Sequence, residues 1–370
     1  MAGSSYGTIF KITTWGESHG KGLGVVVDGC PAGIPLTEDY IQSFLDRRKP
    51  GKNKFSTPRK ENDRVEILSG VFEGLTTGTP ISMIVRNENQ KSGDYNEIAS
   101  YYRPGHADYT FDAKYGFRDY RGGGRSSGRE TIGRVAGGAV AMAMLHALNI
   151  QIHAYTKSIG PISYDPDAFN WEEIQNNALC MPDAAAAKQA QQYLEHCMEE
   201  KNSSGGTVEC IITGVPAGLG DPVFEKLDAN LAKAIFSIGA VKGFEIGDGF
   251  EVATATGLTN NDAFCCDTKG NIFKETNHAG GILGGISDGS PIVFRAAIKP
   301  TPSIAAPQHT VKRDGTPITI EIKGRHDPII VPRAVVVVES MAALTIADAA
   351  LLNLGAKQES VEQLFQKHEL

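Results

Sequence analysis

Two short polar segments hold the residue types in this chain that are best suited to chemistry. Residues 103–108 read Arg-Pro-Gly-His-Ala-Asp, and residues 122–130 read Gly-Gly-Gly-Arg-Ser-Ser-Gly-Arg-Glu. Arginine offers a forked set of donors to carboxylate and phosphate, histidine changes protonation near neutral pH, and glycine lets backbone N–H groups approach an anion closely. The combination predicts a site that grips a small polyanion and moves a proton.

Four further polar or basic segments share this chemistry. They are residues 16–20, 47–54, 299–303 and 324–328. Taken alone, each has a simple structural explanation, because a Gly-Glu-Ser-His-Gly stretch is a common kind of turn and a basic run is commonly a solvated loop. Their convergence favours a ligand site. None of them contains the GxxxxGK[ST] pattern, so we do not expect a P-loop nucleotide site.

The charge of the chain is unevenly distributed. The net charge is -7, yet residues 47–64 carry eight Lys/Arg against two acids, and residues 103–134 carry seven against four. These two windows hold 15 of the 36 basic residues. A nucleic-acid-binding protein normally has a broad positive face, whereas concentrated basic segments in an acidic body suit the focusing of a small anion into a cleft. We therefore expect a small-molecule substrate and no nucleic-acid partner.

Composition points to a soluble protein that needs no disulfide or structural metal to fold. The six cysteines show neither CxxC spacing nor a His/Cys cluster, so we expect reduced thiols, no disulfide framework and no metal site. No run approaches the roughly 18 uninterrupted apolar residues of a membrane helix. The first residues lack the basic, apolar, small-residue order of a signal peptide. We expect a cytoplasmic protein without a membrane partner.

The elements that must position these segments mix strands and helices throughout the chain. Residues 6–14 and 23–28 predict strands on either side of the turn at 16–20, and Thr37 is expected to cap a helix that ends in the basic run 47–51. Further strands are expected within 65–86 and at 208–215, and helices at 136–148, 183–201, 227–236 and 333–354. No linker-like stretch divides the chain. We expect one large α+β domain over residues 1–370 with an internal two-fold arrangement, although no sequence repeat demonstrates the symmetry.

The same segments are similar to the signatures of the chorismate synthase family. Gly16–Pro31 resembles its first signature, Gly124–Thr131 its second and Gly324–Pro328 its third. Other segments that fit are Leu68–Gly74, Arg103–Asp108, Gly214–Gly220, Val241–Phe250 and Asn277–Gly285. The resemblance covers nearly the whole chain in the family's order, and motifs this long and numerous are very specific.

The resemblance implies a fold and an activity. The family converts 5-enolpyruvylshikimate 3-phosphate to chorismate by 1,4-anti elimination of phosphate, in the shikimate pathway to the aromatic amino acids. It requires reduced FMN although the reaction has no net redox change. The implied fold is a β-α-β sandwich with helices packed between antiparallel sheets and a pseudo-two-fold arrangement, and the implied assembly is a homotetramer. A substrate with a phosphate and two carboxylates, together with an anionic cofactor, accounts for clustered arginines in an acidic body.

The resemblance also implies roles for individual residues. His19 looks like the acid that protonates the departing phosphate, and His106 like the group that protonates reduced flavin around its N1/O2 edge. Asp327 resembles the carboxylate near flavin N5 that helps this nitrogen take up the proton lost from substrate C6. With anionic ligands bound, we expect raised pKa values to keep both histidines cationic. The expected substrate-binding residues are Arg48, Lys54, Arg103, Arg129 and Arg325. The expected FMN-binding residues are Arg125, Ser126, Ser127, Gly239, Ala240, Gly284, Lys299, Pro300, Thr301, Pro302, Ser303 and Arg325.

Three positions depart from the residues usual in the family. Lys54 stands where many relatives have arginine, so a forked contact becomes a point-charge contact. Gly239 replaces a usual asparagine and removes an amide expected beside the flavin. Ile329 replaces a usual cysteine, a change that we expect to affect packing only.

Two other functions stay open at this point. The first is a flavin-dependent oxidoreductase with net hydride transfer, although no strand–GxGxxG–helix unit for a nicotinamide nucleotide is present. The second is a catalytically silent protein that binds flavin or anions, which the presence of His19, His106 and Asp327 disfavours. Some family members reduce their own flavin with NADPH, and the sequence is compatible with both behaviours.

Overall fold

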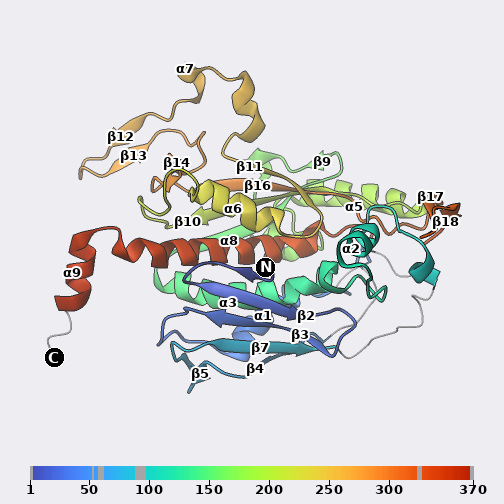
Figure 1. Cartoon of the computed structure of the whole chain (residues 1–370). Helices are drawn as coiled ribbons and strands as arrows, with labels where there is room; N and C mark the ends of the chain where they lie inside the picture. Colours follow the sequence, from blue (N-terminus) through green and yellow to red (C-terminus); the bar gives the residue numbers. More distant parts are fainter. Residues whose placement is uncertain (1–2, 52–53, 57–61, 88–96, 323–326, 367–370) are drawn as a thin grey trace.

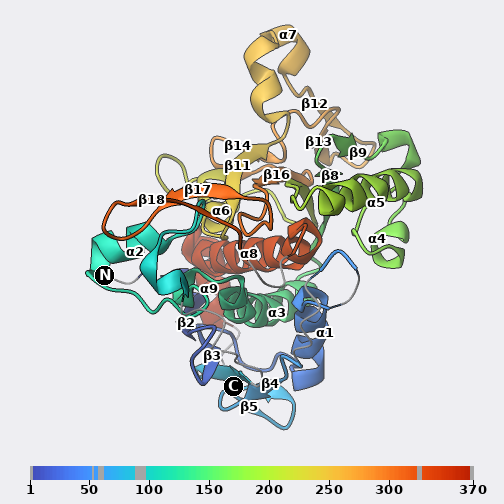
Figure 2. The ribbon, with the colours of Figure 1, turned by 90° about the vertical axis from the view of Figure 1, so that its right-hand side faces the viewer.

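Two antiparallel sheets enclose a layer of helices. The computed structural model describes residues 3–51, 54–56, 62–87, 97–322 and 327–366, so the predicted ligand-binding residue Arg325 lies outside the described residues. One sheet, the layer of helices and the second sheet are stacked in turn (Figure 1). The view turned by 90° shows the same helices lying between the sheets (Figure 2). The predicted β-α-β sandwich of the α+β class is confirmed.

Each half of the chain contributes one five-stranded sheet. The first runs in the order β1 (Ser5–Tyr6), β2 (Lys11–Gly16), β3 (Gly22–Asp28), β7 (Ile81–Arg86) and β4 (Val65–Ile67). The second runs in the order β11 (Val241–Ile246), β16 (Ile292–Ile298), β10 (Gly206–Thr213), β8 (Gln151–Ile159) and β9 (Ile162–Ser163). In β7 and in most of β16, buried residues alternate with more exposed ones, as expected for sheets that pack one face on a core.

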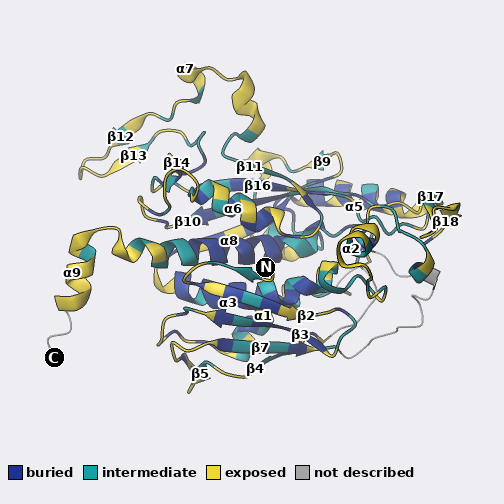
Figure 3. Cartoon of the chain, viewed as in Figure 1, coloured by how far each residue is buried: buried dark blue, intermediate teal, exposed yellow. Residues whose placement is uncertain are grey.

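In the described part of the chain, four helices fill the space between the sheets. They are α1 (Glu38–Arg48), α3 (Thr131–Ala147), α6 (Leu227–Phe236) and α8 (Val331–Leu352). Thr37 caps α1 as predicted, since its side chain accepts a hydrogen bond from the Tyr40 N–H at 3.2 Å. A Cβ on Gly138 of α3 would lie 2.3 Å from the Ser340 Cβ of α8, so this glycine permits the close approach of the two central helices. Burial is densest in this layer (Figure 3).

Helix α8 is the most apolar element of the core. By length and composition it is long and apolar enough to cross a membrane, but 72% of its most apolar window is buried inside the protein. Such burial is typical of the core helix of a globular protein. The predicted buried helix at 333–354 is thereby confirmed.

Further helices and strands lie outside the two five-stranded sheets and the central helices. The helical ones are η2 (Glu97–Ser100), α2 (Asp108–Tyr115), η3 (Gly124–Ser126), η4 (Gly128–Glu130), η5 (Pro166–Ala168), α4 (Glu173–Asn176), α5 (Ala184–Glu199), η6 (Gly249–Thr254), α7 (Gly257–Asn260), η7 (Asn353–Gly355) and α9 (Gln358–Gln366). The short strands are β5 (Val71–Phe72), β6 (Leu75–Thr76), β12 (Phe264–Cys266), β13 (Ile272–Lys274), β14 (Ile282–Leu283), β15 (Ile286–Ser287), β17 (Gln308–Val311) and β18 (Pro317–Ile320). The sequence reading did not predict α2, α9 or the projecting arm formed by residues 249–276 (Figure 1).

Candidate active site

The turn that carries His19 connects β2 to β3 and is held by Ser18. The Ser18 hydroxyl donates to the Gly122 carbonyl at 3.1 Å and lies 3.1 Å from the His19 Nδ1. Because the single hydroxyl proton points to the carbonyl, Ser18 accepts from an Nδ1–H, which leaves Nε2 as the nitrogen that exchanges a proton in the neutral ring. Gly122 has φ +74°, and a Cβ there would lie 2.0 Å from the His19 Cε1. Glycine at 122 is therefore a condition for this position of the imidazole.

Arg125 ties the segment that precedes α3 to β2. Its guanidinium donates to the carbonyls of Gly16 and Thr14 at 3.1 and 3.2 Å and to the Thr14 hydroxyl at 2.6 Å. Glu130, which is 9% exposed, accepts from the same Thr14 hydroxyl and lies 3.7 Å from Arg125. The structure thus gives Arg125 an anchoring role in addition to the flavin contact expected from the sequence.

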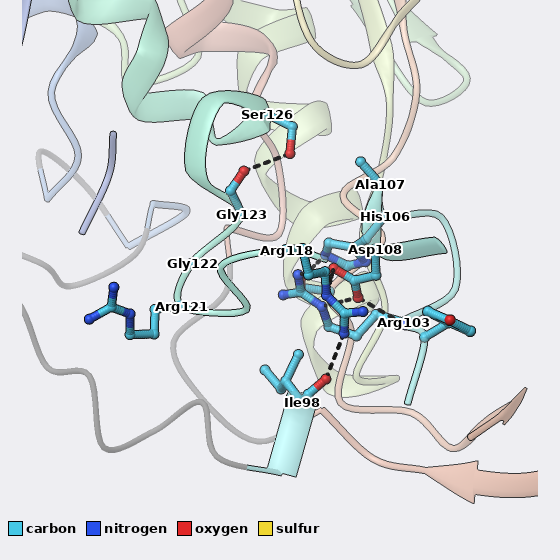
Figure 4. Close-up of polar contacts among 12 residues, drawn as sticks. Ile98, Arg103, His106, Ala107, Asp108, Arg118, Arg121, Gly122, Gly123 and Ser126 are labelled. Atoms are coloured by element: carbon cyan, nitrogen blue, oxygen red, sulfur yellow. Dashed lines mark hydrogen bonds and ion pairs between the residues drawn. The ribbon is translucent and has the colours of Figure 1, made fainter. Parts of the chain in front are cut away.

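The two neighbouring serines make local contacts. Ser126 donates to the Gly123 carbonyl at 2.7 Å, and Ser127 accepts from the Arg129 N–H at 3.3 Å as the N-cap of η4. Figure 4 shows the Ser126–Gly123 bond closing the glycine-rich turn. These contacts hold the segment from Gly122 to Arg129 in a defined shape.

Arg48 and Arg129 share one buried carboxylate, and we call Arg48, Asp63 and Arg129 the Asp63 cluster. Arg48 is 1% exposed and contacts Asp63 Oδ2 at 2.5 Å, while Arg129 lies 3.1 Å from Asp63 Oδ1. Burial lowers the pKa of Arg48 to about 10, although Asp63 acts in the opposite direction. Burial alone would raise the pKa of Asp63, but the two arginines outweigh it and lower that pKa. The cluster holds two cations for one anion and is suited to receive another anion.

Asp327 joins the Asp63 cluster through Arg333, a residue of α8. The Arg333 Nη1 donates to Asp327 Oδ2 at 2.7 Å, and its Nε donates to the Arg48 carbonyl at 3.0 Å. One guanidinium therefore bridges the predicted catalytic carboxylate and the end of α1. This bridge orients the Asp327 carboxylate relative to Arg48.

His106 lies beside a second charged group, which we call the Asp108 cluster and which consists of Arg103, Asp108, Asp112 and Arg118. Figure 4 shows His106 next to Arg103, Asp108 and Arg118. Arg103 donates through Nε and Nη2 to the two oxygens of Asp108, each at 2.8 Å. Arg118 donates to Asp112 at 2.6 Å and to the Ile98 carbonyl at 2.9 Å. The fork of Arg103 is thus engaged by the carboxylate of Asp108.

The ring of His106 is held at both nitrogens. Nδ1 lies 2.9 Å from the Pro104 carbonyl and Nε2 lies 2.8 Å from the Ser303 hydroxyl. The carbonyl can only accept, so Nδ1 carries the proton and Nε2 accepts from Ser303 in the neutral ring. Burial lowers the pKa of His106 to about 4, with Arg103 adding to the effect. The histidine is neutral here at pH 7, and a bound anion has to raise its pKa for the cationic state expected with ligands.

The segment from Lys299 to Ser303 packs against the His106 loop. The Lys299 ammonium donates to the Gly105 carbonyl at 3.0 Å, and its backbone N–H donates to the Ala240 carbonyl at 2.9 Å. Burial lowers the pKa of Lys299, and Lys242 adds to this. The Thr301 Oγ1 is buried and has no hydrogen-bond partner among the described residues. The structure thus brings Lys299 and Ser303 to the loop that carries His106, and Ala240 to the backbone of Lys299.

Two predicted ligand residues have other surroundings. Lys54 pairs with Glu195 of α5 and is 61% exposed in that pair. Gly284 is exposed in the turn between β14 and β15, and a Cβ there would meet nothing within 4 Å. Among the described residues, neither of them makes a hydrogen bond or an ion pair with a member of the two clusters.

A separate cavity of about 1110 Å³ lies behind Arg333. Its lining includes residues of α1, α3, β8 and α8, together with Trp171. Neither His19 nor His106 lines it. Arg333 therefore stands between this cavity and Asp327.

Sequence reasoning missed four residues that organise the site. They are Asp63, Asn87, Gly122 in its contact with His19, and Arg333. Asp63 was present in the sequence as one of two acids in a basic run, which was a usable signal. Asn87 and Gly122 have their partners far away in the chain, and Arg333 joins Asp327, six residues before it, to the distant Arg48 carbonyl.

The layered fold, together with these groups of arginines, histidines and carboxylates, is what is expected of an α+β enzyme that acts on a small polyanion. Comparison with known proteins names the family. A family model described as chorismate synthase matches residues 10–351. The chorismate synthase of Agathobacter rectalis is 70% identical over 367 residues, which are 99% of this chain and 100% of that protein.

More distant relatives agree. The chorismate synthase of Cytophaga hutchinsonii is 52% identical over 352 residues, covering 95% of this chain and 98% of that protein. A solved structure described as the crystal structure of chorismate synthase is 33% identical, has a TM-score of 0.76 and covers 98% of each chain. The chain belongs to the chorismate synthase family, whose members are carbon–oxygen lyases acting on phosphates.

Proposed function

We propose that the chain forms chorismate from 5-enolpyruvylshikimate 3-phosphate at the site built around the Asp63 cluster, His19, His106 and Asp327. The observation that carries the proposal is one continuous network. It runs from the His19 turn through Asn87 to Arg129, and from Arg48 through Arg333 to Asp327. A proton donor and a carboxylate are thereby tied to the same pair of arginines.

The Asp63 cluster is suited to bind the anionic groups of the substrate. Its arginines are oriented before the substrate arrives, because Asp63 and the Gly128 carbonyl hold Arg48, while Asp63 and Asn87 hold Arg129. Such pre-orientation lowers the entropic cost of binding and stabilises negative charge that develops on the departing phosphate. Arg103 and Arg325 would complete the binding of the substrate.

Three groups are proposed to move protons. His19 protonates the departing phosphate from Nε2, because Ser18 and Gly122 set its tautomer. Asp327 helps to receive the proton from substrate C6. His106 gains a proton at Nε2 when anions bind, and the Ser303 hydroxyl stays in contact by turning from donor to acceptor.

The residues present fit reduced FMN as the cofactor. Thr301 offers a buried hydroxyl without a partner among the described residues, and Lys299 offers an ammonium whose pKa burial lowers. Ser303 adds a second hydroxyl in the same segment. The residues proposed to hold FMN are Arg125, Ser126, Ser127, Gly239, Ala240, Lys299, Pro300, Thr301, Pro302, Ser303 and Arg325, together with Gly284. Reduced FMN, when bound, supplies electron-rich ring chemistry that leaves the overall reaction without net redox change.

We further propose a single domain over residues 1–370 that assembles into a cytoplasmic homotetramer. One continuous apolar core that includes residues from both sheets supports the single domain. The projecting arm supports self-association because its large apolar side chains are uncovered: Phe250 is 79% exposed, Leu258 98% and Ile272 75%. Light scattering after gel filtration tests the assembly, and a monomer at working concentration would contradict it.

The proposed reaction is tested by following phosphate and chorismate under anaerobic conditions with chemically reduced FMN. We expect equal amounts of the two products and none without reduced flavin. Net oxidation of the flavin in proportion to product would favour the flavin-dependent oxidoreductase. Binding of substrate and FMN without turnover would favour the catalytically silent binding protein. A parallel reaction with NADPH and oxidised FMN, without added reductant, decides whether the chain reduces its own flavin.

A further inference from the structure

Asn87 stands where β7 ends and is not among the residues implied by the family resemblance. Its side-chain Nδ2 donates to the carbonyls of Glu17 and Gly20 at 2.9 and 2.8 Å. Its Oδ1 accepts from the Arg129 Nη2 at 2.8 Å. One amide thus spans both ends of the turn that carries His19 and reaches a member of the Asp63 cluster.

The partners determine how this amide is oriented. Two carbonyl oxygens need donors and a guanidinium needs an acceptor, so only the orientation with Nδ2 toward Glu17 and Gly20 satisfies all three contacts. A carboxylate of nearly the same shape cannot make them, because one of its oxygens would face two carbonyl oxygens. The position therefore requires an amide rather than a negative charge.

The two sides of the bridge depend on Asn87 to different degrees. Arg129 keeps a second anchor in Asp63 at 3.1 Å. The His19 turn has its own 3.1 Å hydrogen bond from the Gly20 N–H to the Glu17 carbonyl, but the two bonds from Asn87 tie that turn to Arg129. Loss of the amide should therefore displace His19 more than Arg129.

We propose that Asn87 is a positioning residue that holds the His19 turn in register with Arg129. The inference rests on the proposed roles of His19 and Arg129. It predicts that changes at Asn87 act on the chemical step more than on substrate binding. A residue with a purely structural role would lower stability without separating kcat from KM.

The test compares Asn87→Ala, Asn87→Asp and Asn87→Gln with the wild type, under anaerobic conditions and with saturating reduced FMN. Displacement of a catalytic group by about 1 Å costs on the order of a hundredfold in rate, so we expect Asn87→Ala to lower kcat by roughly ten- to a hundredfold with KM changed less than about threefold. Asn87→Asp should be at least as impaired despite its added charge next to Arg129. Asn87→Gln keeps the amide and should recover part of kcat.

Asn177 supplies the matched control. Its Nδ2 donates to the carbonyls of Glu173 and Met181 at 2.6 and 2.8 Å, and its Oδ1 accepts from two backbone N–H groups, of Leu179 and Met181. Asn177→Ala removes a similar set of bonds outside the two clusters, so it should lower Tm and leave kcat unchanged.

The outcomes separate this inference from the proposed function. A wild type that forms no chorismate would overturn the proposed function. If the wild type is active, two results would overturn the role of Asn87. One is a wild-type kcat in Asn87→Ala, and the other is a kcat in Asn87→Asp that is close to that of the wild type. If Asn87→Ala does not fold, the comparison of the Gln and Asp variants decides, because only an amide should support turnover.

Discussion

The Asp63 cluster and the Asp108 cluster use the same residue types in opposite ways. In the first, two arginines share one buried carboxylate, so positive charge is left over. In the second, the fork of Arg103 is taken by both oxygens of Asp108, and burial lowers the pKa of His106 beside it to about 4. The first arrangement is ready to bind an anion. The second keeps a histidine neutral until an anion arrives. The same density of arginine in a sequence is therefore compatible with two different electrostatic functions.

The largest expected effect comes from removing the charge of Asp63. Asp63→Asn keeps the size of the side chain and tolerates the φ of 46°, but it leaves the buried guanidinium of Arg48 without its carboxylate. Breaking a buried pair in this way costs about 3–5 kcal/mol, which we expect as the loss in free energy of unfolding on denaturant titration. The control is Asp119→Asn, whose pair with Arg121 is solvent-exposed, so the loss in free energy of unfolding should be much smaller than for Asp63→Asn. Equal losses in the two variants would contradict the account of the Asp63 cluster.

Gly122→Ala tests whether the shape of the glycine turn positions His19. The new Cβ would overlap the imidazole, so the ring has to move, and we expect kcat to fall by roughly a hundredfold. Gly116→Ala is the matched control because Gly116 has a similar φ of +80° and a Cβ there would meet nothing within 4 Å. Both variants carry the same backbone strain, so equal kcat values in the two would show that contact with His19 is unimportant.

The neutral state of His106 predicts a dependence of stability on pH. Its pKa is lowered from 6.5 to about 4 on folding, so the unfolded chain binds more protons between these values. This contribution to stability is complete above pH 6.5 and is lost as pH falls toward 4, with about 2 kcal/mol lost between pH 7 and pH 5. Denaturant titrations at both pH values should show a smaller loss in His106→Asn. NMR titration of the His106 ring should show that its pKa rises when substrate and FMN are bound. An unchanged pKa would contradict the proposed change of His106 from the neutral to the cationic form.

The smallest effect is expected at Gly239. A Cβ there meets nothing within 4 Å and its φ is not left-handed, so Gly239→Asn should change the free energy of unfolding by less than about 0.5 kcal/mol. If the amide usual in the family contacts the flavin, the variant should bind reduced FMN more tightly than the wild type. Unchanged affinity for reduced FMN would show that the protein binds its cofactor without a side-chain amide at position 239.

Most elements of the core could be predicted from periodicity and caps, and the residue types of the site from motifs. Thr37 and the apolar run of α8 are local signals, and both led to the correct helices. Asn87 gave no such signal because its side-chain partners lie 42 to 70 residues away, and the bond from Arg333 to the Arg48 carbonyl spans 285 residues. The projecting arm was also missed, since its apolar residues face outward and follow no pattern of burial. The lowered pKa of His106 depends on burial first and on the charges of Arg103 and Lys299 after it, and only the folded chain buries the ring and brings Lys299 to it.

The proposed reaction depends most on His19 as the proton donor to the departing phosphate. Its direct test is a single-turnover measurement of chorismate formation by His19→Ala with reduced FMN under anaerobic conditions, together with substrate affinity. We expect the rate to fall by about a hundredfold or more, in the range of a lost general acid, while Kd for the substrate changes only a few-fold. Chorismate formation at the wild-type rate in this variant would contradict the assignment.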